Sequence, residues 1–273
     1  MADESVYYED GEHGAPRFSW RDYIRRMVSG MAAKRFKNRP QAGKLLARRL
    51  TVYAERPDVI ILALPRGGVP VAASIANILN VPLDVMLVRK LGVPGNEELA
   101  MGAIASGGTP VTTPDVVQMF GLTTDVIEAA AARESREIAR REVAYREGSA
   151  PPELKDRTVI LVDDGLATGA TMLAAARATR IEHPAHIVIA VPVGPPDTCS
   201  LLSAEADEII CLTTPHPFFA VGQWYEDFAQ TTDEEVIQLL HEARQRRNDA
   251  ATRAAAQPGN KNASGISHEG TEA

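Results

Sequence analysis

The sequence predicts an α/β protein with a doubly wound, mostly parallel sheet flanked by helices. Two observations lead to this prediction. Short runs of consecutive apolar, largely β-branched residues are typical of strands covered on both faces of a parallel sheet. These runs alternate along the chain with segments of helical pattern, as they do in α/β folds. The runs cover residues 58–64, 83–88, 158–162, 187–193 and 208–212.

The segment before the first strand is predicted to be helical. Residues 20–36 carry apolar side chains at helical spacing, which favours a short helix packed on its own domain over one that binds a partner. Pro40 is placed to open a second helix with an apolar side. We therefore expect an N-terminal extension with a short helix over residues 1–35 and a main domain over residues 36–245. The aperiodic residues 246–273 are expected to form a disordered tail.

Helices are expected between the strands of the main domain. Residues 69–79 follow the first strand, and residues 170–180 follow the third. Gly and Pro interrupt residues 91–113, where we expect a loop and a β-hairpin-like excursion. Residues 124–147 form a long, Ala-rich, charged helix with a thin apolar side. We expect this helix to be solvent-exposed, with a lid or a dimer element as the alternatives.

Composition limits the classes of partner. The 273 residues include 29 Lys and Arg against 36 Asp and Glu, and the net charge of -7 disfavours nucleic acid. Cys199 and Cys211 are too few for a disulfide framework, and we expect buried thiols in a reducing compartment. We find neither a signal-peptide pattern nor an apolar run approaching about 18 residues. We therefore expect a cytoplasmic protein without a membrane partner.

Glycines and charges follow three of the predicted strands. They are Pro65-Arg66-Gly67-Gly68, Arg89-Lys90 and Asp163-Asp164-Gly165, the last continuing into Ala167-Thr168-Gly169-Ala170-Thr171 at a helix start. Ligands of open parallel sheets bind beyond the carboxyl ends of the strands, so these segments predict a ligand site at that edge.

The third of these segments is suited to a phosphorylated sugar. Free amides and the helix dipole at the start of residues 170–180 can hold a phosphate, and Thr168 and Thr171 can add hydroxyl donors. Ionised Asp163 and Asp164 can accept hydrogen bonds from vicinal sugar hydroxyls. The alternative is structural, with Asp163 capping a turn and Thr168 capping the helix.

Residues 159–171 resemble the signature with which type I phosphoribosyltransferases bind 5-phosphoribosyl-1-pyrophosphate (PRPP). That signature is an apolar strand, two acidic residues and a small Thr-Gly-x-Thr loop. Gly165 departs from it, since a larger apolar residue is common there. The resemblance covers about residues 36–245 and extends to a bacterial subgroup with Arg-Gly-Gly, Lys-Leu-Gly-x-Pro-Gly-Asn and Val-Gly-Gln-Trp-Tyr segments. It implies the type I phosphoribosyltransferase fold with a small hood.

The resemblance also implies a set of site residues. Those expected to bind PRPP are Asp163, Asp164, Gly165, Ala167, Thr168, Gly169, Ala170, Thr171, Arg66, Gly67, Gly68 and Arg89. The catalytic set is Asp163, Asp164, Arg66 and Lys90. Mg²⁺ would be bound through PRPP, with Asp163 and Glu97 as candidate protein ligands. The alternative for Arg89 and Lys90 is that their charges are solvated and bind no ligand. Glu98 is expected to be a solvated charge.

The aromatic stretch after the last strand lies where the family builds its hood. Its members Phe218, Phe219, Trp224 and Tyr225 could stack on a base or could equally belong to the core. The implied function is transfer of the 5-phosphoribosyl group from PRPP to a nitrogen acceptor, with release of pyrophosphate, by a homodimer. One alternative is a non-catalytic PRPP-binding regulator. Another, an enzyme acting on a different phosphorylated sugar, is disfavoured because Gly-x-x-x-x-Gly-Lys and Gly-x-Ser-x-Gly motifs are missing.

Overall fold

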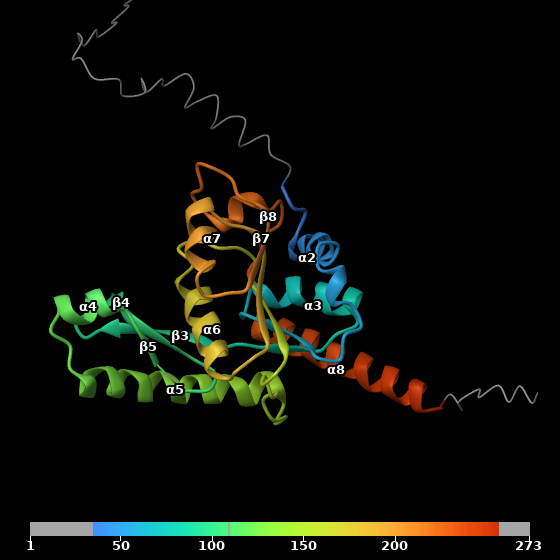
Figure 1. The fold of residues 1–273 in the computed structure, drawn as a ribbon, viewed down its shortest axis with the longest axis horizontal. Helices are drawn as coiled ribbons and strands as arrows, with labels where there is room; N and C mark the ends of the chain where they lie inside the picture. The colour runs from blue at the N-terminus through green and yellow to red at the C-terminus, as the bar shows by residue number, and fades with distance from the viewer. Residues whose placement is uncertain (1–34, 109, 257–273) are drawn as a thin grey trace, which may run out of the picture. The chain divides into compact units, whose positions relative to one another are not determined.

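The computed structural model describes residues 35–108 and 110–256, and its centre is a five-stranded sheet in the order β2-β1-β6-β7-β8 (Figure 1). All neighbouring strands of this sheet are parallel. The strands are β1 (Val59–Ala63), β2 (Leu83–Val85), β6 (Thr158–Val162), β7 (His186–Val193) and β8 (Glu208–Thr213). The predicted fold class is therefore confirmed.

Helices cover both faces of this sheet. In β1, Ile61 packs into the core formed with α2 (Arg39–Ala47), α3 (Gly68–Leu79) and α8 (Asp233–Ala256). The next residue, Leu62, packs on the opposite face. That face is covered by α6 (Ala170–Ile181) and α7 (Pro196–Leu202), while the short 3-10 helix η1 (Thr51–Tyr53) precedes β1. Because both faces are buried, the central strands β1, β6 and β7 are apolar at almost every position rather than at alternate ones.

A second, antiparallel sheet follows β2. It contains β3 (Val88–Val93), β4 (Asn96–Ala105) and β5 (Pro110–Thr112), and α4 (Pro114–Met119) follows it. The excursion expected over residues 91–113 is thus a three-stranded sheet. The single strand expected over residues 83–88 is wrong, because β1 ends at Ala63 and offers β2 no partner beyond that point. Val88 pairs instead with Ala105 of β4.

Helix α5 (Thr124–Arg146) forms where expected, but only one of its faces is exposed to solvent, and the other is buried. Ala130 and Ala131 are buried in the main core, and Arg146 is 3% exposed. The guanidinium of Arg146 pairs with Asp84 of β2 at 3.0 Å, and the Tyr145 hydroxyl bonds Asp233 of α8. Small alanines allow close helix packing and ion pairs neutralise the buried charge, so a thin apolar stripe is enough to bury this face.

The predicted domain limits need correction at the C-terminal side. Helix α8 continues to Ala256, so residues 246–256 are helical rather than part of a tail. Ala and Arg are strong helix formers even without apolar periodicity. The remainder of the expected tail, and almost all of the extension expected over residues 1–35, lie outside the described residues. Among the helices that the structure describes, none is long and apolar enough to cross a membrane.

The two cysteines are free and lie on the α6–α7 face of the sheet. Both are only partly buried. Burial raises the pKa of the Cys211 thiol to about 12, and its Sγ donates to the Thr213 carbonyl at 3.2 Å. These thiols are therefore protonated at neutral pH, as expected of packing residues rather than nucleophiles.

Candidate functional site

The loops after β1 and β6 meet at the carboxyl edge of the parallel sheet. The chain runs from β1 through α3 to β2 on one side, and from β6 through α6 to β7 on the other, so the boundary between β1 and β6 is the switch point of the sheet. A Cβ built on Gly68 would lie 3.0 Å from the Cα of Asp163. Two of the three predicted segments thus lie directly against one another at this edge.

The carboxylates of Asp163 and Asp164, at this meeting point of the two loops, each have one oxygen engaged by the protein. Asp163 Oδ1 accepts a hydrogen bond from the Asp164 amide at 2.8 Å, and Asp164 Oδ2 accepts one from Arg39 Nε, also at 2.8 Å. Burial, and then the neighbouring Asp164 charge, raise the pKa of Asp163 well above its usual value. Burial also raises the pKa of Asp164, although the Arg39 bond acts in the opposite direction.

Arg39 was not among the residues predicted for this site. It is the first residue of α2, its Nη1 donates to the Ala229 carbonyl at 2.6 Å, and its Cζ lies 3.9 Å from the centre of the Phe228 ring. The Tyr225 hydroxyl donates to the Asp164 carbonyl at 2.6 Å. Residues 224–229 and the start of α2 therefore form a cover that is bonded to Asp164 at two points.

Backbone hydrogen bonds hold this cover together. Phe36 pairs with Tyr225 in a parallel bridge, its amide donating to the Trp224 carbonyl at 2.8 Å. Trp224, at the end of the 3-10 helix η2 (Val221–Trp224), and Tyr225 are 7% and 2% exposed. The alternative prediction, that Trp224 and Tyr225 belong to the core, is therefore correct. Phe219, at 62% exposure, remains available for stacking on a base.

The loop from Gly165 to Thr171 forms the expected turn before α6. Gly169 caps the helix with φ of +76°, a left-handed conformation that suits glycine. Ala167, Thr168 and Ala170 are exposed, and the Ala170 amide reaches the Thr168 hydroxyl at 3.5 Å. Exposed residues therefore lie at the start of the 12-residue α6, where a phosphate would bind.

Gly165, the departure from the family signature, is explained by packing. A Cβ at this position would lie 2.6 Å from Cγ1 of Val221 and 3.0 Å from Cγ1 of Val193. Val221 of η2 and Val193 of β7 therefore approach the turn too closely for a larger residue, and the turn is tightly packed.

The loop after β1 contributes its backbone and one guanidinium. Gly67 precedes α3, and the Pro65–Arg66 peptide is cis. The Arg66 side chain is 37% exposed, and its Nη1 lies 4.0 Å from Asp233 of α8. A partly exposed guanidinium beside the start of a 12-residue helix is suited to an anion such as a diphosphate.

The other predicted basic and acidic residues lie elsewhere. Arg89 and Lys90 belong to β3 of the antiparallel sheet, so their expected place at the carboxyl end of a parallel strand is wrong. Arg89 Nε pairs with the buried Glu134 at 2.9 Å, and Lys90 is exposed. Glu97, in β4, lies 3.6 Å from Arg133. The contacts described for these residues involve neither Asp163 nor Asp164, and the Glu98 side chain is outside the described part.

Residues that could hold a metal are few within the described ranges. No group of three or more His, Cys, Asp or Glu side chains is gathered there in a way that would bind a cation. Mg²⁺ is commonly bound by one or two carboxylates together with substrate phosphates. Asp163 and Asp164, each with a second oxygen, fit that mode, whereas Glu97 is engaged on another sheet.

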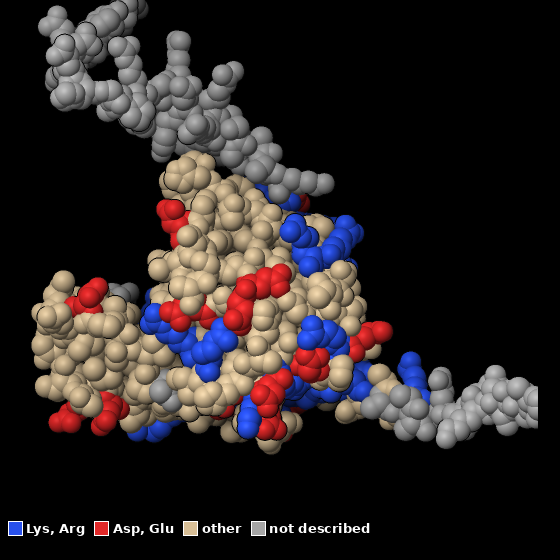
Figure 2. Space-filling view, viewed as in Figure 1, with Lys and Arg blue, Asp and Glu red and all other residues tan. Residues whose placement is uncertain are grey.

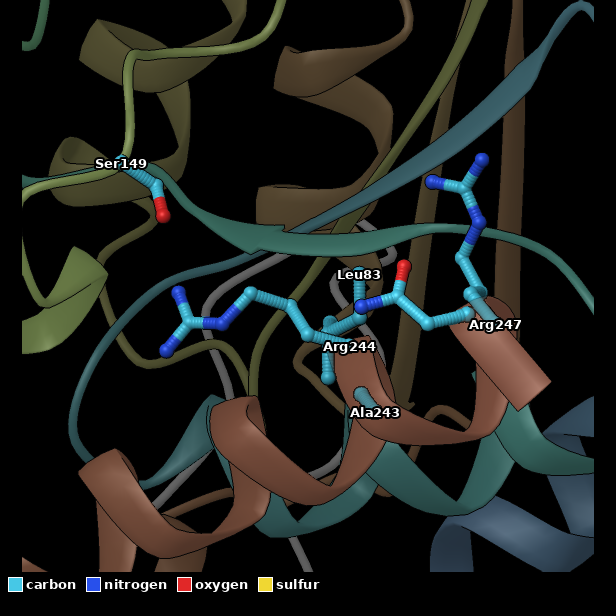
Figure 3. A pocket seen from close by; sticks show the side chains of 6 residues that line it. Leu83, Ser149, Ala243, Arg244 and Arg247 are labelled. Carbon is cyan, nitrogen blue, oxygen red and sulfur yellow. The ribbon is translucent and has the colours of Figure 1, made fainter.

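A cavity of about 390 Å³ lies at the opposite edge of the sheet, near the first residue of β2 (Figure 3). It is lined by Leu83, Ser149, Ala243, Arg244, Arg247 and Asn248. Figure 3 shows the Arg244 side chain directed toward Ser149 and away from Arg247. None of these six residues belongs to the predicted site, which is formed by the loops at the carboxyl edge.

Comparisons with known proteins show the family to which this chain belongs. A family model described as the phosphoribosyl transferase domain matches residues 36–226. Proteins provisionally named phosphoribosyl transferases in Mycobacterium tuberculosis strains H37Rv and CDC 1551 are 45% identical over 210 residues, or 77% of this chain and 47% of theirs. The chain thus spans about half the length of these curated relatives.

A solved structure, TT1426 from Thermus thermophilus, is 43% identical with a TM-score of 0.68. The match covers 76% of this chain and 98% of that one. The solved relative therefore has the same fold over nearly its whole length, and this chain belongs to the phosphoribosyl transferase domain family.

Proposed function

We propose that the loops after β1 and β6 bind PRPP where they meet at the carboxyl edge of the sheet. The observation that carries this proposal is the meeting of three elements at one edge: the carboxylates of Asp163 and Asp164, the start of α6, and the Arg66-Gly67-Gly68 turn. The second oxygens of the carboxylates would accept the ribose hydroxyls. The Ala167–Thr171 loop would hold the 5-phosphate, and the Arg66 turn would hold the diphosphate.

The proposed reaction transfers the 5-phosphoribosyl group to a nitrogen acceptor. The nitrogen lone pair attacks C1 of the ribose as the C1–O bond breaks, and the electrons of that bond leave with pyrophosphate. Positive charge builds on the ring during this step, as in glycoside hydrolysis, and Asp163 and Asp164 would stabilise it. Arg66 would neutralise charge on the leaving group. Mg²⁺, when bound with PRPP, would add Lewis-acid stabilisation of the same charge.

The proposed acceptor is a nucleobase or related compound. Phe219 is a large, exposed aromatic side chain in the segment before the cover, and planar bases stack on such rings. Acidic and basic side chains are interspersed on the face of the molecule shown in Figure 2, so that face offers no continuous basic surface for nucleic acid. We further propose a cytoplasmic homodimer.

A non-catalytic PRPP-binding regulator is the second candidate, and one observation favours it. Arg89 and Lys90, which were expected to neutralise the leaving group, lie on β3, and Arg89 pairs with Glu134. Neutralisation of the leaving pyrophosphate would then depend on Arg66 and Mg²⁺, without the two other cations that were expected there.

A pyrophosphate-release assay separates the two candidates. The protein is incubated with PRPP and Mg²⁺ and with each common purine and pyrimidine base in turn. Release that depends on one base would establish the transferase and identify its acceptor. PRPP binding without release for any base would favour the regulator.

A further inference from the structure

Helix α8 carries a cluster of arginines in a chain that is acidic as a whole. Arg244, Arg246 and Arg247 lie together on this helix, whereas the net charge of the chain is -7. Arg244 and Arg247 line the cavity of about 390 Å³ near the start of β2, which we call the α8 cavity. A smaller pocket shares Arg247 with it. Among the described residues that line these two hollows, none is acidic.

The three arginines differ in their partners. Arg244 donates to backbone carbonyls at the end of α5 and pairs with Glu147 at 2.8 Å. Arg246 lies 3.8 Å from Glu242. Arg247 is exposed and has no carboxylate within 4.0 Å among residues 35–108 and 110–256. The charge of Arg247 is therefore the one in this cluster that no described side chain neutralises.

Arg157 adds positive charge beside Arg247. Its Nη2 donates to the Val59 carbonyl at 2.9 Å, at the amino end of β1. Burial, and then the neighbouring charge of Arg247, lower the pKa of Arg157. Asp58 acts in the opposite direction, but its carboxylate is paired with Arg56 at 2.5 Å. The two guanidiniums therefore repel one another, and a bound anion would relieve this repulsion.

The lining of the α8 cavity suits phosphoryl groups. Arg244 and Arg247 are three residues apart and so lie on neighbouring turns of one side of the helix. Figure 3 shows their side chains extending in different directions, that of Arg244 toward Ser149. Guanidiniums bind phosphoryl oxygens through paired N–H groups, and the Ser149 hydroxyl and Asn248 amide offer neutral donors. Small-molecule sites have volumes of roughly 300–1,000 Å³, a range that includes this cavity.

We propose that the α8 cavity binds a small metabolite that carries at least two phosphoryl groups. Arg247 holds one of these groups, and Arg244 with Ser149 holds the other. A bounded cavity in a chain of net charge -7 favours a small anion over a nucleic acid, which needs an extended cationic surface.

This site is separate from the one proposed for PRPP. Asp233, the first residue of α8, lies 4.0 Å from Arg66 of the turn after β1. Arg247 follows fourteen residues later on the same helix, which is about 21 Å away at about 1.5 Å per residue. The two proposals therefore stand or fall independently.

The test is an NMR titration of the isotope-labelled chain with inorganic tripolyphosphate in the absence of Mg²⁺. The backbone amide signals of Ser149 and Asn248 report on the α8 cavity. Those of Gly67 and Gly169 report on the loops proposed for PRPP, so that binding at the two places is distinguished in one experiment.

Three variants are compared with the unaltered chain. Arg247→Met removes the unpaired cation, and Asn248→Asp places a carboxylate in the lining while both arginines remain. The control Arg253→Met removes an exposed arginine of the same helix that does not line the cavity. The spectrum of each variant before titration shows that it is folded.

We expect the Ser149 and Asn248 signals of the unaltered chain to shift saturably. The midpoint concentration should rise by at least about tenfold in Arg247→Met, which loses charge-assisted hydrogen bonds, and in Asn248→Asp, where like charges meet. In Arg253→Met it should change by less than about twofold. No saturable shift of these two signals, or an equal rise in Arg247→Met and Arg253→Met, would overturn the proposal.

The source of the phosphoryl groups is tested in two parallel titrations of the unaltered chain, with a sugar bisphosphate and with a short single-stranded oligonucleotide. The proposal predicts that the sugar bisphosphate saturates the Ser149 and Asn248 signals at the lower concentration. Saturation at a lower concentration by the oligonucleotide would overturn the assignment of a small metabolite.

Discussion

Gly67 lies so close to Asp164 that a Cβ on the glycine would be 2.0 Å from the carboxylate Oδ2. The backbone of the loop after β1 therefore packs against the same oxygen that accepts a hydrogen bond from Arg39. In the proposed complex, this contact links the diphosphate loop to the sugar site.

Substitution of Gly67 by alanine is expected to impair binding by displacing Asp164. We expect PRPP affinity to fall by more than about tenfold, equivalent to about 1.4 kcal/mol, because the carboxylate and Arg39 must both shift. Calorimetry with PRPP and Mg²⁺ measures the change. Gly43→Ala is the matched control, since a Cβ there would meet the Val71 carbonyl at 2.3 Å between α2 and α3. It should lower stability, and an equal fall in affinity for the folded control would contradict the local explanation.

Replacement of Asp163 by asparagine is expected to stabilise the free protein. The pKa of Asp163 is higher in the folded protein than in the unfolded chain. The protonated carboxyl therefore contributes to stability below the unfolded pKa, and this contribution is lost as pH rises through the folded pKa. At pH 7 the asparagine avoids that loss, and we expect the free energy of unfolding to rise by about 1 kcal/mol. The gain should shrink as pH falls, because both forms are then neutral. Urea unfolding at several pH values measures it.

Asp164→Asn is expected to have the opposite effect on stability. It also removes a carboxylate whose pKa is raised by burial, but it leaves the largely buried guanidinium of Arg39 without its anionic partner. Breaking a buried pair in this way costs about 3 kcal/mol or more. If urea unfolding showed both asparagine variants to be stabilised, Arg39 would not depend on Asp164 as described.

The parts of the site that are contiguous in sequence could be predicted. Strand β6 and the turn into α6 were recognised because an apolar run, two acids and a Thr-Gly-x-Thr loop lie within residues 159–171. Their meeting with the β1 loop followed from the geometry of parallel strands. Arg39 could not be recognised, because it is 125 residues from Asp164 and belongs to no local pattern.

The position of Arg89 shows a second limit. The apolar run over residues 83–88 continues without a break into Arg89, and nothing in its composition marks the departure from the parallel sheet. The length of the neighbouring strand decides it, since β1 ends at Ala63 and the chain then pairs with β4. Strand partners are a tertiary property that a single run of residues does not encode.

Arg89→Ala is expected to lower the stability of the antiparallel sheet and to leave PRPP binding unchanged. Arg89 is 39% exposed and Glu134 also pairs with Arg133, so the loss of stability should be about 1 kcal/mol or less. PRPP affinity should change by less than about twofold. A large loss of affinity at unchanged stability would return Arg89 to the diphosphate site.

Tyr225→Phe tests whether the Tyr225 hydroxyl holds the cover to Asp164. The substitution removes the bond to the Asp164 carbonyl at 2.6 Å and leaves a buried acceptor, at a cost of about 1–2 kcal/mol in unfolding free energy. Phe219→Leu, at an exposed position, should stay within about 0.5 kcal/mol. Equal stabilities of the two variants in thermal or urea unfolding would contradict the assignment of Tyr225 to the cover.

In the proposed complex, Asp163 and Asp164 receive the ribose of PRPP. Calorimetric titration of PRPP with Mg²⁺ into the unaltered protein and into Asp163→Asn tests it most directly, because this variant is expected to be more stable, and a loss of binding could not then be ascribed to unfolding. We expect saturable binding of PRPP by the unaltered protein and a loss of affinity of at least about tenfold in the variant. Absence of binding to the unaltered protein, or equal affinity in the two, would contradict it.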